Sequence, residues 1–340
     1  MTDRRTFVKV AAAAALAPGL TRCGRPATPP PEPWSASAYR KTDRSAVAVL
    51  AAGDYDGRLV EVVQRGLDLF EIDVRDRRVV LKPNFVEFDP DNAINTNPVL
   101  IAATIEAFRL RGAREVVVAE GPGHRRDTEY IVTASGLSDA LRDTGARYVD
   151  LNGDAVRAVA AASSYTALGT LYLPTTVLDA DLLVSMPKLK THHWAGVTLS
   201  LKNLFGIMPG PVYGWPKNVL HWAGIEPSIL DINASLPVPR FNLVDGIIGM
   251  EGNGPIQGVP RRGGFLVFGP DPVAVDATAS RLMGIEPQRL WYLAQADRFL
   301  GNLAGERIEQ RGESLETFAQ EFALLAELEH LRPARMTGSG

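Results

Sequence analysis

The sequence predicts an α/β fold in which a parallel or mixed sheet is covered by helices. Short apolar runs alternate along the chain with stretches of helical periodicity, which is typical of parallel strands buried on both faces. Of the 340 residues, 46% are hydrophobic and 22% are charged, as in an ordinary globular protein. A chain of this length also buries a sizeable core without cross-links.

The first half alternates strand and helix regularly. The run AVAVLA predicts a buried first strand, and Leu59, Val63 and Leu67 fall on one face of the helix that follows. Gly112 ends the second helix. The expected strands are 46–51, 79–82, 115–120 and 147–150, and the expected helices are 57–70, 98–111 and 137–144.

The second half is richer in glycine and proline but continues the alternation. Asp271 followed by Pro272 is a typical helix start, because Asp caps free backbone N–H groups and Pro fits the first turn. The expected strands are 181–185, 241–244 and 265–268, and the expected helices are 198–205, 272–283 and an amphipathic 314–330. We expect one domain, residues 45–335, with two lobes of about 45–180 and 181–335 around a central cleft.

The first residues are typical of a twin-arginine export signal. Arg4 and Arg5 precede Phe7 and Lys9, and an apolar run follows over residues 10–20. A membrane-spanning helix needs about 20 apolar residues, so this run fits a signal core. We expect residues 1–23 to direct the chain through the twin-arginine machinery to the periplasm or another extracytoplasmic space. The alternative is an ordinary basic and apolar N-terminus.

The segment after the signal is predicted to be a tether. Residues 24–44 are rich in proline, which favours an extended linker. Cys23 is a candidate lipid-attachment site, with Leu20 correctly placed before it, although Arg22 stands where a small residue is usual. The N-terminus is therefore a candidate membrane tether.

Composition also excludes several classes of protein. Cys23 is the only cysteine, so this chain forms no internal disulfide and no iron–sulfur cluster of its own. The net charge is −3, without the basic excess that nucleic-acid binding needs.

Three segments that follow predicted strands carry polar and ionisable side chains, at residues 82–85, 120–126 and 186–193. Ligands of parallel sheets bind beyond the carboxyl ends of the strands, so we expect these segments to meet around a small anion. The candidate anion-binding residues are Lys82, Asn84, Arg125, Arg126, Lys188 and Lys190. A further ligand loop is expected at Asp245, Glu251 and Asn253.

Four of the five histidines are expected in loops or at loop–helix junctions: His124, His192, His193 and His221. Imidazole is a common transition-metal ligand and the usual proton carrier near neutral pH. Without a cysteine cluster, these histidines suit nickel, copper, iron or zinc with mixed ligands. The alternative is that they are separate surface or packing residues.

Four strings carry a family resemblance: residues 80–84 (VLKPN), 187–192 (PKLKTH), 200–206 (SLKNLFG) and 245–247 (DGI). On these strings the chain resembles the family called domain of unknown function 362, over about residues 80–284. Many relatives carry added ferredoxin-type cysteine motifs, which this chain lacks.

Other motifs resemble, more distantly, the lactate racemases, which are α/β enzymes with a nickel-pincer cofactor attached to a lysine. The matching pieces are Gly123-His124-Arg125, His192 upstream of Lys202, Pro209-Gly210, and His221. The resemblance implies an acid–base pair of His124 and His192, a cofactor held by Lys202, Asn203 and Gly123, and metal ligation by His221 and His193. A simpler interpretation is that Lys202 extends to solvent.

These observations lead to two functional hypotheses. The first is an exported enzyme, dependent on a metal or organometallic cofactor, that acts on a small hydroxy or keto acid by histidine-mediated proton or hydride transfer, as an isomerase or oxidoreductase. The second is a non-catalytic extracytoplasmic protein that binds a metal or an anion. The first requires His124, His192 and His221 to converge on one site.

The export hypothesis predicts that replacing both Arg4 and Arg5 with Lys stops export, because the arginine pair is the feature that the route reads. Cell fractionation with an antibody against the mature chain measures this. Unchanged export of the variant would contradict the hypothesis.

Overall fold

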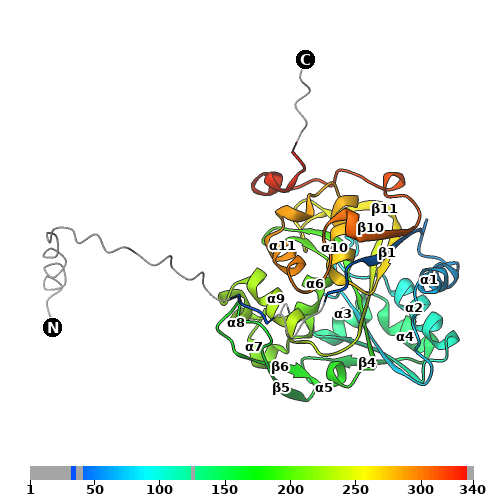
Figure 1. Cartoon of the computed structure of the whole chain (residues 1–340). Coiled ribbons are helices and arrows are strands. Elements are labelled where there is room, and N and C mark those ends of the chain that lie inside the picture. Colours follow the sequence, from blue (N-terminus) through cyan, green and yellow to red (C-terminus); the bar gives the residue numbers. More distant parts are fainter. Residues whose placement is uncertain (1–31, 36–40, 124–126, 335–340) are drawn as a thin grey trace, which may run out of the picture. The chain divides into compact units, whose positions relative to one another are not determined.

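The computed structural model describes residues 32–35, 41–123 and 127–334, and the described residues from 33 onward belong to one compact unit (Figure 1). The predicted signal, Cys23, His124, Arg125 and Arg126 lie outside the described residues. Within the described part, no helix is both long and apolar enough to cross a membrane.

One mixed sheet organises the fold. Its strand order is β12-β1-β11-β10-β7-β2-β3-β4, with β8 and β9 attached through β10. Neighbours run parallel, except that β11 is antiparallel to β1 and β10, and β9 to β8. The bounds are β1 Ser45–Ala51, β2 Arg78–Pro83, β3 Glu115–Glu120, β4 Arg147–Asp150, β7 Leu182–Met186, β8 Lys188–His192, β9 Gly196–Thr198, β10 Arg240–Glu251, β11 Val259–Gly269 and β12 Ile308–Gly312.

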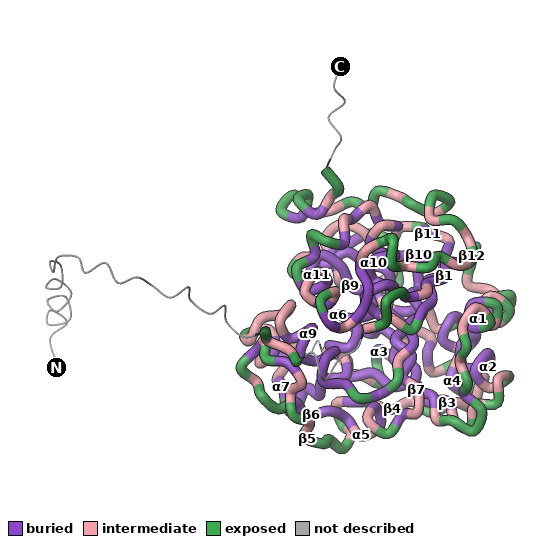
Figure 2. Tube along the Cα trace, in the orientation of Figure 1, coloured by how far each residue is buried: buried purple, intermediate pink, exposed green. Residues whose placement is uncertain are grey.

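Successive residues of a strand contribute alternately to two hydrophobic cores, one on each face of the sheet. Ala48 and Leu50 of β1 pack with the helices of one face, whereas Val47 and Val49 pack with those of the other (Figures 1 and 2). The first face is covered by α1 Leu59–Asp68, α2 Pro98–Leu110, α3 Thr128–Ala134 and α4 Leu137–Thr144. The second is covered by α6 Ser200–Asn203, α9 Ile225–Ser235, α10 Pro272–Leu282 and α11 Trp291–Asp297.

Smaller elements complete the chain. A hairpin of β5 Val156–Ala160 and β6 Thr170–Pro174 forms a separate two-stranded sheet. The short helices are α5 Thr175–Leu178, α7 Gly210–Tyr213 and α8 Asn218–Trp222. The 3₁₀ turns are η1 Leu204–Ile207, η2 Pro287–Arg289, η3 Gly305–Arg307, η4 Leu315–Thr317 and η5 Ala326–Leu331.

The expected fold class and most of the expected elements are confirmed. Asp271 caps α10 by accepting hydrogen bonds from the Val273 and Ala274 amides, with Pro272 in the first turn as expected. The expected division into two lobes is not confirmed, because strands from both halves share one sheet: β7 pairs with β2.

Two expected elements are wrong. The segment 186–193 is not one loop, since residues 188–192 form β8 against the second half of β10. The terminal helix over 314–330 is also absent: only η4 and η5 form there. The backbone of residues 320–323 instead bonds to other elements, with the Phe322 amide donating to the Met283 carbonyl. Burial of Phe322 in the core outweighs local helical periodicity.

The linker expected over 24–44 contacts the body at its described residues. Trp34 pairs with Ser163 and stacks on Phe299 with ring centroids 5.0 Å apart. Lys41 forms an ion pair with Asp297. Parts of this segment are therefore docked rather than extended into solvent.

The cap of α10 gives a stability prediction. Asp271 also accepts hydrogen bonds from Ser45 and the Asn302 amide, so Asp271→Ala strands several buried donors and should cost about 2–4 kcal/mol of unfolding free energy. Urea denaturation measures the loss, with the exposed Asp143→Ala as control, expected to change it by less than ~0.5 kcal/mol. An equal effect of both variants would contradict this role.

Candidate functional site

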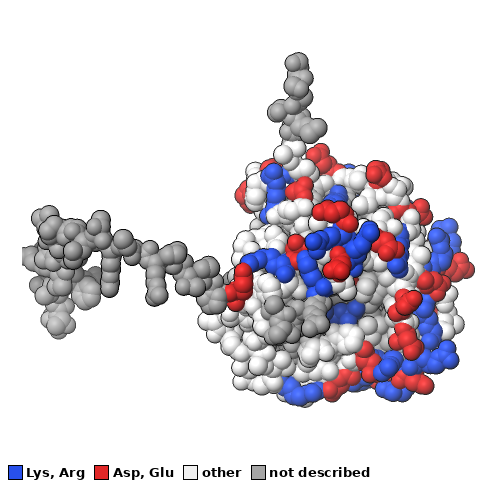
Figure 3. Space-filling view, viewed as in Figure 1, with Lys and Arg blue, Asp and Glu red and all other residues white. Residues whose placement is uncertain are grey.

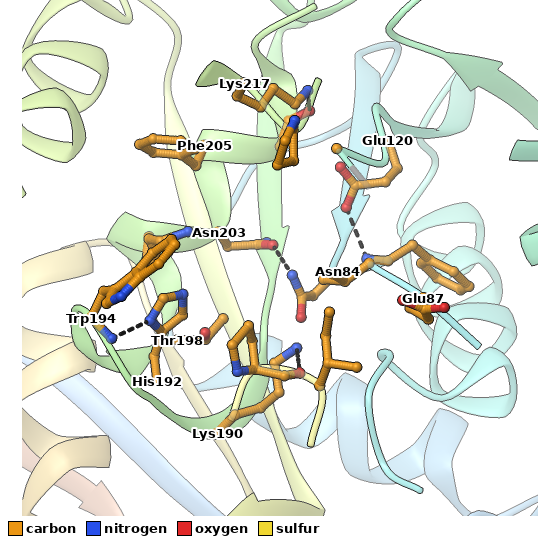
Figure 4. A pocket seen from close by; sticks show the side chains of 18 of the residues that line it. Asn84, Glu87, Glu120, Lys190, His192, Trp194, Thr198, Asn203, Phe205 and Lys217 are labelled. Atoms are coloured by element: carbon orange, nitrogen blue, oxygen red, sulfur yellow. Dashed lines mark hydrogen bonds between the residues drawn. The ribbon is translucent and has the colours of Figure 1, made fainter. Parts of the chain in front are cut away.

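A cavity of about 420 Å³ lies beyond the carboxyl ends of β2 and β3 (Figure 4). Its wall comes from five segments: residues 82–87, 120–123, 190–206, 216–221 and 253–257. The position follows the rule for α/β sheets, in which ligands bind where parallel strands end.

The base of this pocket is a buried ion pair. Lys82 Nζ lies 2.6 Å from Glu120 Oε2, with 0% and 1% of their side chains exposed. The Glu120 carboxylate also accepts hydrogen bonds from the amides of Phe85 and Gly121, so it fixes the backbone after both strands. A Cβ at Gly206 would lie 2.4 Å from Glu120 Oε1, so only glycine lets η1 pack on the pair.

Two amides extend this polar floor. Asn203 Oδ1 accepts from Lys82 Nζ, and Asn203 Nδ2 donates to the Lys82 carbonyl. Because a carbonyl only accepts, the orientation of the Asn203 amide is fixed. Asn84 Nδ2 then donates to Asn203 Oδ1 at 3.3 Å, and Asn84 Oδ1, in the pocket wall, has no donor among the described residues.

Three more lysines line the pocket without a carboxylate partner among the described residues. Lys190 Nζ donates to the carbonyls of Ile94 and Pro255, and burial, then the charges of neighbouring lysines, hold the pKa of Lys190 well below its usual value. Lys217 Nζ donates to the carbonyls of Gly121 and Met208. Burial lowers the pKa of Lys217 to about 7.

Lys202 differs from the other pocket lysines. Within the described residues its Nζ has no hydrogen-bond or ion-pair partner, and it lies 4.4 Å from the ring centroid of Phe205. Burial, and then the charge of Lys82, lower the pKa of Lys202 to about 8. The half-buried side chain lines the pocket rather than extending into open solvent.

Backbone contacts decide which nitrogen of each described pocket histidine carries the proton. His192 Nδ1 accepts from the amides of Trp194 and Ala195, at 3.1 and 3.2 Å (Figure 4). The neutral ring therefore keeps its proton on Nε2. Burial and nearby cations hold the pKa of His192 well below its usual value, so the neutral ring offers its Nε2–H as a hydrogen-bond donor. The acid–base role expected for His192 stays a prediction.

His193 and His221 have the opposite arrangement. His193 Nδ1 lies 2.7 Å from the Gly254 carbonyl, and His221 Nδ1 lies 3.0 Å from the Lys217 carbonyl. Each Nδ1 must donate, which leaves each Nε2 lone pair free, as far as the described residues go, for a proton or a metal. Burial lowers the pKa of His221 and keeps it neutral near pH 7.

The expected metal pair is not a preassembled centre. The Trp194 ring contacts both His193 and His221, with centroids 4.5 and 5.7 Å away. In the described part of the chain, no three His, Cys, Asp or Glu side chains are grouped to hold a metal ion. A bare metal ion would therefore find too few protein ligands among the described residues. A cofactor that supplies most of the metal's donor atoms itself needs only one free imidazole from the protein.

The structure brings together most of the sequence-predicted site. The expected residues that line the pocket are Lys82, Asn84, Gly123, Lys190, His192, His193, Lys202, Asn203, His221 and Asn253. Three of them lie in secondary structure where a loop or junction was expected: Lys190 and His192 are in β8, and His221 is in α8.

Three expected site residues lie elsewhere. Lys188 forms a buried ion pair with Asp245 at 2.8 Å, and both bond to the Tyr55 hydroxyl. These three side chains bond to one another outside the pocket, although Lys188 and Tyr55 also line a second cavity. Glu251 accepts from the Ala323 amide near Arg261 and does not line the pocket.

Sequence reasoning left out several pocket residues: Glu120, Trp194, Thr198, Phe205 and Lys217. Glu120 had a usable signal, because a carboxylate that ends an apolar strand next to Lys82 is a natural partner for it. Lys217 had none, since its role depends on a left-handed backbone, with φ of 70°, that turns its side chain under the Gly121 loop.

A family model matches residues 79–281 of the chain and is described as a domain of unknown function (DUF362). The chain belongs to the DUF362 family. Its similar curated proteins include the thylakoid-associated protein sll1697 of Synechocystis sp., with 28% identity over 223 residues, 65% of this chain and 67% of that protein. The matched segment contains the pocket lysines and histidines.

Solved structures similar to this DUF362 chain match at a TM-score of 0.39. One is a structural-genomics target from Thermotoga maritima, at 15% identity, over 66% of this chain and 57% of that one. Another is the lactate racemase apoprotein from Thermoanaerobacterium thermosaccharolyticum, at 16% identity, over 59% and 51%. The chain spans little more than half of either.

The environment of Lys202 predicts an amine that becomes reactive at unusually low pH. An amine reacts when neutral, so acetylation of Lys202 should rise through pH about 8, against about 10.4 for an ordinary lysine. Competitive acetylation read by peptide mass spectrometry measures the midpoint. The control is a denatured sample, in which the lysines are exposed. The same midpoint for Lys202 and for this control would contradict the effect of the pocket on Lys202.

Proposed function

We propose that this chain is an enzyme that binds a small anionic substrate in the pocket and transfers a proton through its histidines. The single observation that carries the proposal is that, within the described residues, the Lys202 amine has no hydrogen-bond partner and the Nε2 lone pair of His221 is free, while both side chains contact the Phe205 ring. An amine and a neutral base beside one small cavity suit chemistry on a bound molecule.

The charges of the wall support an anion as substrate. Glu120 compensates Lys82, whereas Lys190, Lys202 and Lys217 contact carbonyls or a ring within the described residues. Burial is the main cause of their lowered pKa values, and repulsion from neighbouring lysines adds to it. A bound carboxylate or phosphate would supply a counter-charge. On the outer face in Figure 3, by contrast, charges of both signs are interspersed.

The proposal divides the proton chemistry between His221 and His192. His221 accepts a proton from the substrate at Nε2, because its Nδ1 is held by the Lys217 carbonyl. His192 donates a hydrogen bond from Nε2 to the oxygen on which charge develops, because its Nδ1 is occupied by two amides. The acid–base role expected for His124 stays a prediction.

The residues present fit an attached organometallic group better than a bare ion. Lys202 would carry such a group and His193, whose Nδ1 is likewise held by a carbonyl, would be its protein ligand, so that the Nε2 of His221 stays available for the proton. When bound, a nickel-pincer group would supply a hydride acceptor, which is an alternative to removal of a carbon-bound proton by His221. Lys82, Lys190 and Lys217 would still hold the substrate anion.

We also propose that the mature chain works outside the cytoplasm, as the twin-arginine motif predicts, tethered through its N-terminal segment. A second candidate function is a non-catalytic anion-binding protein. The lysine-rich wall alone favours it, because anion capture needs no proton acceptor. The proton-transfer residues separate the two functions.

Protein purified from its own host should show an added mass on Lys202 together with nickel, and Lys202→Met should remove both. Lys41→Met, outside the pocket, is the matched control and should keep both. Intact-mass and metal analysis measure this. Unmodified Lys202 with no metal would contradict the cofactor part of the proposal.

His221→Ala should slow exchange of a substrate carbon-bound proton by about 10²-fold or more, because the proton acceptor is lost. Proton NMR in deuterated buffer, across a panel of hydroxy and keto acids, measures exchange. His330→Ala, far along the chain and exposed, is the control. Anion binding without exchange in the wild type would favour the binding protein over the enzyme.

A further inference from the structure

Two buried polar atoms of the pocket wall lack a partner among the described residues: Asn84 Oδ1 and Thr198 Oγ1. Their residues are only 7% and 4% exposed. A buried polar atom without a hydrogen bond costs free energy, so such atoms on a cavity wall indicate what the cavity holds. Figure 4 places Asn84, Thr198, Asn203 and His192 around the same space.

The unpartnered Asn84 oxygen defines the ligand chemistry most sharply. Its orientation follows from a chain of contacts: the Lys82 carbonyl orients Asn203, and Asn203 Oδ1 takes the Asn84 amide nitrogen. An amide oxygen only accepts hydrogen bonds, so its partner must be a donor. The ligand therefore needs more than negative charge.

The surrounding charges select the kind of donor. Lys82, Lys190 and Lys202 all line the pocket, and a ligand ammonium group would be repelled by them. A neutral O–H avoids this repulsion. In the chain without a group attached to Lys202, the donors for anionic oxygens are Thr198 Oγ1, Lys202 Nζ and the Nε2–H of His192.

We propose that the ligand of this pocket is an oxyanion that carries its own O–H donor, with the O–H bonded to Asn84 Oδ1 and the anionic oxygens facing Thr198 and Lys202. The inference rests on the proposed function, because it takes the ligand to be an anion. Two sources share this chemistry: a hydrogen phosphate group, or a carboxylate with a neighbouring hydroxyl.

Matched pairs of probes test the inference by calorimetry near pH 7 on the full chain. Phosphate carries an O–H at this pH and sulfate does not, although their shapes are alike. Malate and succinate have the same charge and differ by one hydroxyl. The donor-bearing member of at least one pair should bind about tenfold more tightly, the equivalent of one well-placed hydrogen bond. Discrimination within the first pair identifies a phosphate source, and within the second a hydroxycarboxylate.

Variants distinguish ligand contacts from structural ones. In Asn84→Leu, the affinities for the two members of each pair should differ by no more than about twofold. Thr198→Val should weaken anion binding about tenfold, yet leave the melting temperature unchanged or raised, because it removes an unsatisfied hydroxyl. Ser280→Ala removes another unpartnered buried hydroxyl that does not line the pocket, and should leave binding unchanged.

The outcomes separate this inference from the proposed function. Equal binding within both pairs overturns the donor requirement and leaves anion binding standing. No binding of any probe at tens of millimolar overturns both. A lower melting temperature for Thr198→Val with unchanged affinity assigns Thr198 to the scaffold and overturns its contact with the anion.

Discussion

The buried contact between Lys82 and Glu120 is the interaction on which the site depends. It joins the ends of β2 and β3, orders the amides of Phe85 and Gly121, and orients Asn203. Breaking such a pair leaves an uncompensated charge inside the protein, which costs far more than the pair contributes as a whole. The same pair lies directly against Gly206, so the Cβ of any other residue at this position would collide with it. The pocket is thus assembled from segments far apart in the sequence through one carboxylate and one ammonium group.

Local pattern was sufficient for the sheet and insufficient where tertiary contacts decide. The strands β1, β2 and β3 can be recognised in the sequence as continuous apolar runs, because both of their faces are buried. The polar edge strand β12 has no such pattern and was missed. The C-terminal segment has helical periodicity, but its backbone bonds to the strand and helix beside it, as the Phe322 amide does. β8 was missed because it contains Lys188 and Lys190, and lysine is rare on a buried strand.

The site was predictable as a location rather than as a mechanism. The rule for strand ends brought Lys82 and His192 together, and the resemblance to lactate racemases added Lys202. All three line the cavity. The roles of the histidines were not accessible, because they depend on which backbone groups meet each Nδ1. The same limit applies to Lys188, whose partner Asp245 is known only from the fold. Residue types indicate what a site contains, and hydrogen-bond direction decides what each group does.

A double-mutant cycle on the central ion pair tests this account most directly, with Lys82→Met, Glu120→Gln and their combination compared by urea denaturation. Each single variant should lose about 3–5 kcal/mol of unfolding free energy, and the double variant clearly less than the sum, because it leaves no buried charge alone. All three variants should also lose anion binding. Additive losses, or full anion binding in the double variant, would contradict the claim that this pair builds the pocket.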